Sequence, residues 1–183
     1  LGCGGQFELG RSVFLHEQDA CRDWLSNKDL VIVAAGLGGG FAGGFAPEFA
    51  KLARSMGVPC LAYVALPFSF EGRKRSEASR RALNSLREAC AAVPSIECDD
   101  YLPWVDEHGI AAPGICRLRE ECSQAIEGMM RVLAEEGLYD FSIETLLSAF
   151  DLEGSKTVVF SQEVDSCAQD SVERLLEEVM ERI

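Results

Sequence analysis

A glycine-rich stretch between a strand-like run and a helical pattern constrains this chain more than any other feature. Residues 36–44 read Gly-Leu-Gly-Gly-Gly-Phe-Ala-Gly-Gly and follow an apolar run over residues 30–35. Glycines let the backbone approach an anion closely, and the N–H groups at a helix start favour negative charge. The pattern predicts a phosphate-binding turn, although close packing of a strand against a helix also explains such a turn.

The residues after this stretch predict an amphipathic helix near 45–56. Pro47 suits the first turn of a helix. Apolar side chains then recur at helical spacing, at Phe45, Phe49, Leu52 and Met56.

Apolar runs alternate with helical patterns in the rest of the first half. We expect strands near 30–36, 59–66 and 93–97 and a second helix near 72–91. This alternation predicts an α/β fold with a parallel sheet flanked by helices. Residues 99–114 resemble a loop, and a long helix is expected near 115–136.

The last fifty residues predict further elements. Gly137 fits a helix C-cap, and Ser142 is expected to cap a short helix. The inward side chains of that short helix would be Ile143, Leu146, Leu147 and Phe150. A strand over 157–160 and a helix from about residue 166 would follow.

Composition excludes several classes of protein. A formal net charge of −13 over 183 residues argues against a nucleic-acid-binding surface. Eight cysteines without a Cys-x-x-Cys pair predict reduced thiols in a cytoplasmic protein, several of them in the core, and no metal site. No apolar run approaches the roughly 20 residues that span a bilayer, so no membrane span is expected.

With these elements in place, the order of motifs resembles the FtsZ branch of the tubulin/FtsZ family of nucleotide-dependent filament proteins. Residues 1–11 look like the family's LGAGGxPExGR segment, and residues 36–44 look like its signature GMGGGTGTG. Residues 67–75 match PFSFEGxKR without a departure, and residues 124–129 are similar to QxVQGI of the central helix. Gly137 and Leu138 resemble the start of the family's catalytic loop.

The resemblance implies a division of the chain into three parts. Residues 1–114 would be a nucleotide-binding domain without its first strands, residues 115–136 the central helix, and residues 137–183 the catalytic-loop region and part of an activation domain. The chain thus resembles a fragment, and a sheet without its first strands is expected to expose an apolar edge. Such an edge would either make the isolated chain unstable or pair with another chain.

The resemblance also implies a site for GTP or GDP, with Mg²⁺ possible beside the nucleotide. Carried over position by position, Glu71 and Arg75 would contact the ribose and phosphate region. A carboxylate can accept ribose hydroxyls, and a guanidinium can donate two bonds to phosphate. The backbone positions implied along the phosphates are Gly2, Cys3, Gly4, Gly39, Gly40, Ala42, Gly43 and Gly44.

Several positions depart from the family pattern. Phe41 and Gly43 stand where the family has its signature threonines, so hydroxyl contacts to phosphate are lost. Arg119 stands at the aspartate that recognises guanine, and an arginine cannot accept the purine N–H bonds. The family asparagine in the preceding loop maps onto Cys98 or Asp99. Guanine selectivity is therefore an open question.

The catalytic loop departs further. In the family one subunit places acidic residues beside the nucleotide of its neighbour, and here Ser142 and Thr145 stand at the two aspartates. Neither hydroxyl can act as a base near neutral pH. Asp140 and Glu144 are the candidate catalytic residues, as weak substitutes; alternatively they only stabilise a helix start.

Three functions remain open from the sequence. The first is an FtsZ-like, GTP-binding, filament-forming cell-division protein that self-associates head to tail and whose hydrolysis is in question. The second is a degenerate, non-hydrolysing homologue that binds or regulates an authentic FtsZ filament. The third is a dinucleotide-dependent enzyme, because Gly38, Gly40 and Gly43 also satisfy G-x-G-x-x-G. Such an enzyme requires an acidic residue at the end of the next strand. Here that strand ends in Ala65-Leu66-Pro67.

Overall fold

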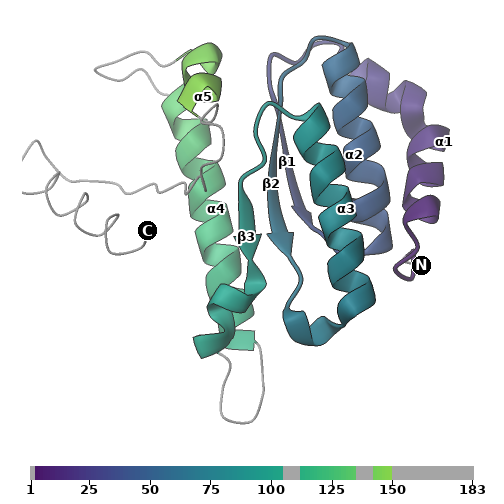
Figure 1. Ribbon diagram of the computed structural model, residues 1–183. Coiled ribbons are helices and arrows are strands. Elements are labelled where there is room, and N and C mark those ends of the chain that lie inside the picture. Colours follow the sequence, from purple (N-terminus) through teal and green to yellow (C-terminus); the bar gives the residue numbers. More distant parts are fainter. Residues whose placement is uncertain (1–2, 105–111, 135–141, 150–183) are drawn as a thin grey trace, which may run out of the picture.

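A three-stranded parallel sheet between two layers of helices forms the described part of the chain (Figure 1). The structure, a computed structural model, describes residues 3–104, 112–134 and 142–149. Strands β1 (Val31–Gly36), β2 (Cys60–Leu66) and β3 (Ser95–Glu97) lie in the order β1-β2-β3, with Val31 opposite Cys60 and Val64 opposite Ser95. The predicted α/β fold is confirmed.

One face of the sheet is covered by α2 (Gly40–Ser55) and α3 (Arg73–Ala89), which make the two crossovers. Helix α1 (Phe7–Leu25) packs against α2, where Phe14 meets Phe45 edge-on with ring centroids 5.5 Å apart. Val64 and Leu86 are buried in the core between this layer and the sheet. The ends of the strands therefore rest on a closely packed, apolar core.

The other face of the sheet is covered by α4 (Ala112–Ala134), which buries Ala125 and Met129 against Leu61 and Tyr63. Short helices complete the described elements: η1 (Ser69–Glu71), η2 (Cys98–Trp104) and α5 (Ile143–Ala149). No helix in these described ranges is long and apolar enough to cross a membrane.

The helix starts differ from the sequence prediction. Helix α2 begins at Gly40, five residues earlier than predicted, so Pro47 lies inside the helix and not in its first turn. Glycine is a weak helix former, but here the contact with α1 fixes the helical start. Helix α4 begins at Ala112, three residues early, which puts Pro113 in its first turn, where a missing N–H costs nothing.

Two further elements were predicted incompletely. Helix α1 was not predicted, and part of the expected loop over 99–114 is the helix η2. Ile143 and Leu147 of α5 are half-buried, as expected. The side chain of Leu146, the predicted cap at Gly137 and everything predicted from Phe150 onward lie outside the described residues.

Strand β1 pairs with β2 alone in the part of the chain that the structure describes. The N–H of Val31 donates to the carbonyl of Pro59 at 3.0 Å, and that of Leu37 donates to Ala65 at 2.8 Å. Because bonding alternates along a parallel strand, the backbone groups of Ile32, Ala34 and Gly36 face away from β2. This edge of the sheet is open there.

Candidate functional site

The candidate site lies where β1 ends and α2 begins, at the carboxyl ends of the parallel strands (Figure 1). Gly38 has a φ of +104°, which glycine adopts without strain, and Gly39 precedes the first helical residue, Gly40. The first backbone hydrogen bond of α2 runs from the N–H of Gly43 to the carbonyl of Gly39, at 3.1 Å. The preceding N–H groups have no partner within the helix, and its first turn carries no acid, so this end attracts anions.

The glycines of the run fall into two groups. A Cβ added at Gly39 would meet no atom within 4 Å, so Gly39 borders open space. A Cβ at Gly43 would lie 1.7 Å from Cε1 of Phe7, and one at Gly44 would lie 2.1 Å from the carbonyl oxygen of Phe7. Close packing thus accounts for Gly43 and Gly44, whose contact with phosphate stays a prediction, while Gly39 has room for a ligand.

The turn before α1 lies beside the start of α2. Gly4 and Gly5 have positive φ values of 52° and 76°, and the N–H of Gln6 donates to Cys3 at 2.8 Å. A Cβ on Gly40 would lie 2.9 Å from Cβ of Cys3, so the two segments touch. The structure therefore brings the predicted Cys3 and Gly40 together, with Gly4 in the same turn, whereas Gly2 lies outside the described residues.

Arg75 forms the opposite wall of the site. A Cβ on Gly38 would lie 2.8 Å from Cγ of Arg75, which places this arginine directly against the glycine loop. Its Nη1 lies 2.7 Å from Oε2 of Glu71, and Oε1 of Glu71 accepts the N–H of Phe68 at 2.9 Å. Glu71 thus positions a half-exposed guanidinium beside the positive end of α2.

Asp99 links the next loop to this wall. Its Oδ1 accepts the N–H of Ser69 at 2.8 Å. The neighbouring Cys98 is buried, and burial, with Glu71 among the nearby charges, raises the pKa of its thiol to about 11. The sequence left open whether Cys98 or Asp99 stands at the family's asparagine. Of the two, Asp99 is the one that bonds to the segment that carries Glu71.

A second polar cluster joins η2 to α4. Both oxygens of Glu121 accept bonds, one from the hydroxyl of Tyr101 and one from Nε of Arg117 at 3.1 Å. Burial raises the pKa of Tyr63 to about 12, and it also raises that of Tyr101. The sequence did not single out Glu121; it pointed to Arg119, which is exposed.

The predicted catalytic segment lies at the other end of the sheet. Oγ of Ser142 accepts the N–H of Thr145 at 3.2 Å and so caps α5 as predicted. Glu144 is exposed, and a hydrogen bond from Ser142 lowers its pKa. Asp140 lies outside the described residues.

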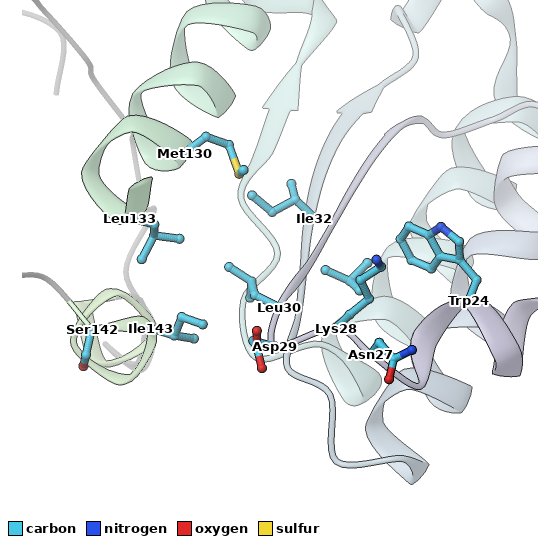
Figure 2. A pocket seen from close by; sticks show the side chains of 11 residues that line it. Trp24, Asn27, Lys28, Asp29, Leu30, Ile32, Met130, Leu133, Ser142 and Ile143 are labelled. Carbon is cyan, nitrogen blue, oxygen red and sulfur yellow. The ribbon is translucent and has the colours of Figure 1, made fainter. Parts of the chain in front are cut away.

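The two predicted groups of site residues are thus not brought together. Ser142 and Ile143 line a cavity of about 640 Å³ with Asp29 and Leu30, just before β1 (Figure 2). The six residues of β1 span roughly 20 Å, so this cavity is far from Gly39, which follows the strand. Ser142 and Glu144, which belong to this described segment, are therefore distant from Gly39 of the same chain.

The cavity itself was not predicted. Its apolar lining comes from two segments of the chain. Leu30 and Ile32, around the start of β1, face Met130 and Leu133 of α4 (Figure 2). Among the described residues there is no group of three His, Cys, Asp or Glu side chains that could hold a metal ion.

A family model and two curated relatives point to the same protein family. A family model described as Tubulin/FtsZ family, GTPase domain, matches residues 1–101. The cell division protein FtsZ of Pseudomonas aeruginosa is 28% identical over 151 residues, which cover 81% of this chain and 38% of that protein. FtsZ of Haemophilus influenzae is 26% identical over 167 residues, covering 90% of this chain and 39% of that protein.

A solved structure gives the same fold. The empty FtsZ dimer of M. jannaschii superposes with a TM-score of 0.74 and 23% identity, covering 82% of this chain and 43% of that one. The chain therefore spans about two fifths of the length of the relatives that it matches.

Proposed function

This chain belongs to the tubulin/FtsZ family, and on that premise we propose that it binds a guanine nucleotide whose phosphates lie at the start of α2. The observation that carries the proposal is the open space over Gly39, next to an arginine that packs against Gly38. The family's GTPase domain implies guanine-nucleotide binding. The positive end of α2 and the guanidinium of Arg75 suit such a ligand in charge.

The phosphate end is argued from charge. The free N–H groups of the first turn of α2 point along the helix axis, and the helix dipole adds positive potential there. Arg75 supplies a full positive charge that a phosphate can bind through two parallel bonds. Mg²⁺ would neutralise the remaining phosphate charge, and no protein cluster is needed to hold it.

The ribose end is argued from Glu71. Its carboxylate already holds Arg75 and the N–H of Phe68, and each carboxylate oxygen can accept a further bond, as a ribose hydroxyl would require. At the base end, Arg119 stands where the family has its guanine-recognising aspartate, and an arginine cannot accept the purine N–H groups. We therefore expect only a modest preference for guanine over adenine.

Equilibrium binding of GTP, GDP and ATP tests the proposal. Arg75→Ala should weaken GTP binding by about tenfold to a hundredfold, because a charged bond contributes about 1.5–3 kcal/mol. Arg73→Ala is the matched control, since this arginine is 91% exposed and pairs with Glu77. Absence of binding to every nucleotide, or equal losses in the two variants, would refute the proposal.

A second function is supported by the cap of α5. Ser142 and Thr145, which stand at the family's catalytic aspartates, bond to each other and to the backbone, and neither carries a charge. This favours a homologue that binds nucleotide and joins a filament with little or no hydrolysis. If Asp140→Ala and Glu144→Ala both leave a measured hydrolysis rate unchanged, neither acid acts as a weak catalytic substitute.

Assembly can be tested separately from turnover. The leading function requires the chain to sediment as a polymer with GTP alone, by contacts that place α5 of one copy near Gly39 of the next. The second requires sedimentation only when an authentic FtsZ filament is present. A protein that pellets in neither case has neither assembly function.

The dinucleotide alternative has less support. The motif requires an acid at the end of the next strand, and β2 instead ends at Leu66 and is followed by Pro67. Saturable binding of NAD with an affinity above that for GTP would be needed to restore this alternative.

A further inference from the structure

Two cysteines that are distant in the sequence lie in contact on the face of the sheet that carries α2 and α3. The Sγ atoms of Cys60 and Cys90 are 3.7 Å apart, although the residues are separated by 30 positions. Cys60 is the first residue of β2, and Cys90 directly follows α3. The site described above uses neither thiol.

The backbone holds the two thiols in this position. The N–H of Ala91 donates to the carbonyl of Cys60 at 2.8 Å, and the N–H of Cys90 donates to Leu86 at 2.7 Å. The guanidinium of Arg54 also donates to the carbonyl of Glu88, which ties the end of α3 to α2. The contact between the thiols is therefore a fixed feature of the fold.

Exposure differs between the two residues. Cys60 is 3% exposed within the apolar core, whereas Cys90 is half-buried at its edge. A small, water-sized oxidant can approach beside Cys90, while a bulky disulfide reagent cannot reach Cys60.

We propose that Cys60 and Cys90 are an oxidation site at which a hydroperoxide produces an intramolecular, reducible disulfide. The Sγ atoms have to approach from 3.7 Å to about 2.05 Å, which small side-chain rotations accomplish because the backbones are already adjacent. The reaction needs no group beyond the two thiols and the peroxide.

The chemistry assigns different roles to the two sulfurs. A hydrogen bond from the Cys90 thiol lowers the pKa of Cys60, and the same bond raises the pKa of Cys90. The thiolate is the nucleophile, and Cys60 is the sulfur that accepts the S–H bond, so Cys60 attacks the peroxide that has entered beside Cys90. Its sulfur bonds to one peroxide oxygen, the O–O bond breaks, and hydroxide leaves as water with the thiol proton.

Cys90 then resolves the product. Its sulfur attacks the sulfenic sulfur of Cys60, the S–O bond breaks, and the departing hydroxide takes the Cys90 proton. Two thiols and one hydrogen peroxide thus give one disulfide and two waters. A dithiol reductant reverses the bond.

The disulfide would join the start of β2 to the end of α3. The opposite ends of these two elements border the candidate site. Strand β2 leads from Cys60 to Leu66, and α3 leads back from Arg73 to Ala89. Closing this 30-residue loop restricts the unfolded chain, so the thermal midpoint should rise by several degrees on oxidation.

Peptide mapping tests the proposal on the full chain. The folded protein is treated with hydrogen peroxide, its free thiols are alkylated, and it is digested with trypsin without reduction. We expect residues 55–73 linked to residues 88–117, with Cys98 and Cys116 alkylated. This species should be lighter by two hydrogens than the sum of the two peptides in that form, and it should be lost after reduction. A folded protein in which both peptides carry only alkylated thiols after peroxide would overturn the proposal.

Variants identify the sulfur within the second peptide, which also contains Cys98 and Cys116. Cys90→Ser and Cys60→Ser should abolish both the linked peptide and the rise in thermal midpoint. Cys98→Ser is the matched control and should retain both, since Cys98 is also buried. A link that persists in Cys90→Ser would show that another cysteine is the partner.

Discussion

The two halves of the glycine run show the same residue serving different purposes. In residues 36–39, a Cβ at Gly36 or Gly39 would meet nothing within 4 Å, and the turn opens towards solvent. In residues 40–44, Gly40, Gly43 and Gly44 have no room for a Cβ, because the turn before α1 and α1 itself fill that space. A glycine-rich motif therefore reports only that side chains are excluded, and the structure shows what excludes them.

This difference makes the two halves separable by mutation. A methyl group in the packed half should reduce stability, while one at Gly39 in the open half should reduce ligand binding and leave stability unchanged. The substitutions below rank from the largest expected loss of stability to the smallest.

Gly44→Ala should destabilise most. Its Cβ would lie 2.1 Å from the carbonyl oxygen of Phe7 and 2.6 Å from the backbone nitrogen of Arg11, so the backbones of α1 and α2 must separate. We expect a loss of about 3 kcal/mol in the free energy of unfolding, the upper range for overpacking. Urea denaturation followed by circular dichroism measures it, and a loss below about 1 kcal/mol would contradict a tight α1–α2 contact.

Gly43→Ala should cost about 2 kcal/mol, because the three atoms nearest to its methyl all belong to the ring of Phe7, 1.7 Å away at Cε1, and a ring can turn aside. In a Phe7→Ala background this cost should shrink, whereas the cost of Gly44→Ala should persist. Double-mutant cycles from the same denaturation experiment give both coupling energies. Equal coupling of the two glycines to Phe7 would be inconsistent with the contacts described.

Gly38→Ala should cost about 1.5 kcal/mol, mainly because a φ of +104° is strained for alanine. The added Cβ would also displace the Arg75 side chain, 2.8 Å away at Cγ, so nucleotide binding should weaken in parallel. Thermal unfolding and GTP titration of one preparation test both. Unchanged GTP affinity in Gly38→Ala would mean that nucleotide binding does not depend on the observed position of Arg75.

Gly39→Ala should leave stability within about 0.5 kcal/mol of the unchanged protein, since its φ of −83° suits any residue and the space is empty. Nucleotide affinity should nevertheless fall by about tenfold, because the methyl enters the volume assigned to phosphate. The phosphate would then lose about one charge-assisted hydrogen bond. Isothermal titration with GTP measures it. Unaltered affinity would show that the phosphates lie elsewhere.

Much of the fold could be predicted because its strands are marked locally. The apolar residues of β1 and β2 lie within one or two positions of the predicted bounds. Helix α1 was missed, although Phe7, Gly10, Phe14, Cys21 and Leu25 recur at helical spacing with buried or half-buried side chains. Its mostly charged surface and its glycine at position 10 hid that pattern.

The site was predicted in part, for a physical reason. Gly39 and Arg75 stand in motifs that are contiguous in the sequence, and the structure places Arg75 against Gly38, the neighbour of Gly39. The contact of Ser69 with Asp99 joins residues 30 positions apart, and that of Tyr101 with Glu121 joins residues 20 apart. Such pairings follow from the packing of whole elements, which no local pattern encodes.

The open edge of β1 has a consequence for solvent exchange of amide hydrogens. Val31, Val33 and Ala35 direct their N–H groups towards β2, whereas those of Ile32 and Ala34 face away from it. Within the described chain, deuterium should therefore enter every second position of this strand early and the positions between them late. Any polypeptide that comes to lie along the edge would erase this alternation, so the labelling pattern of one short strand reports whether that edge is occupied.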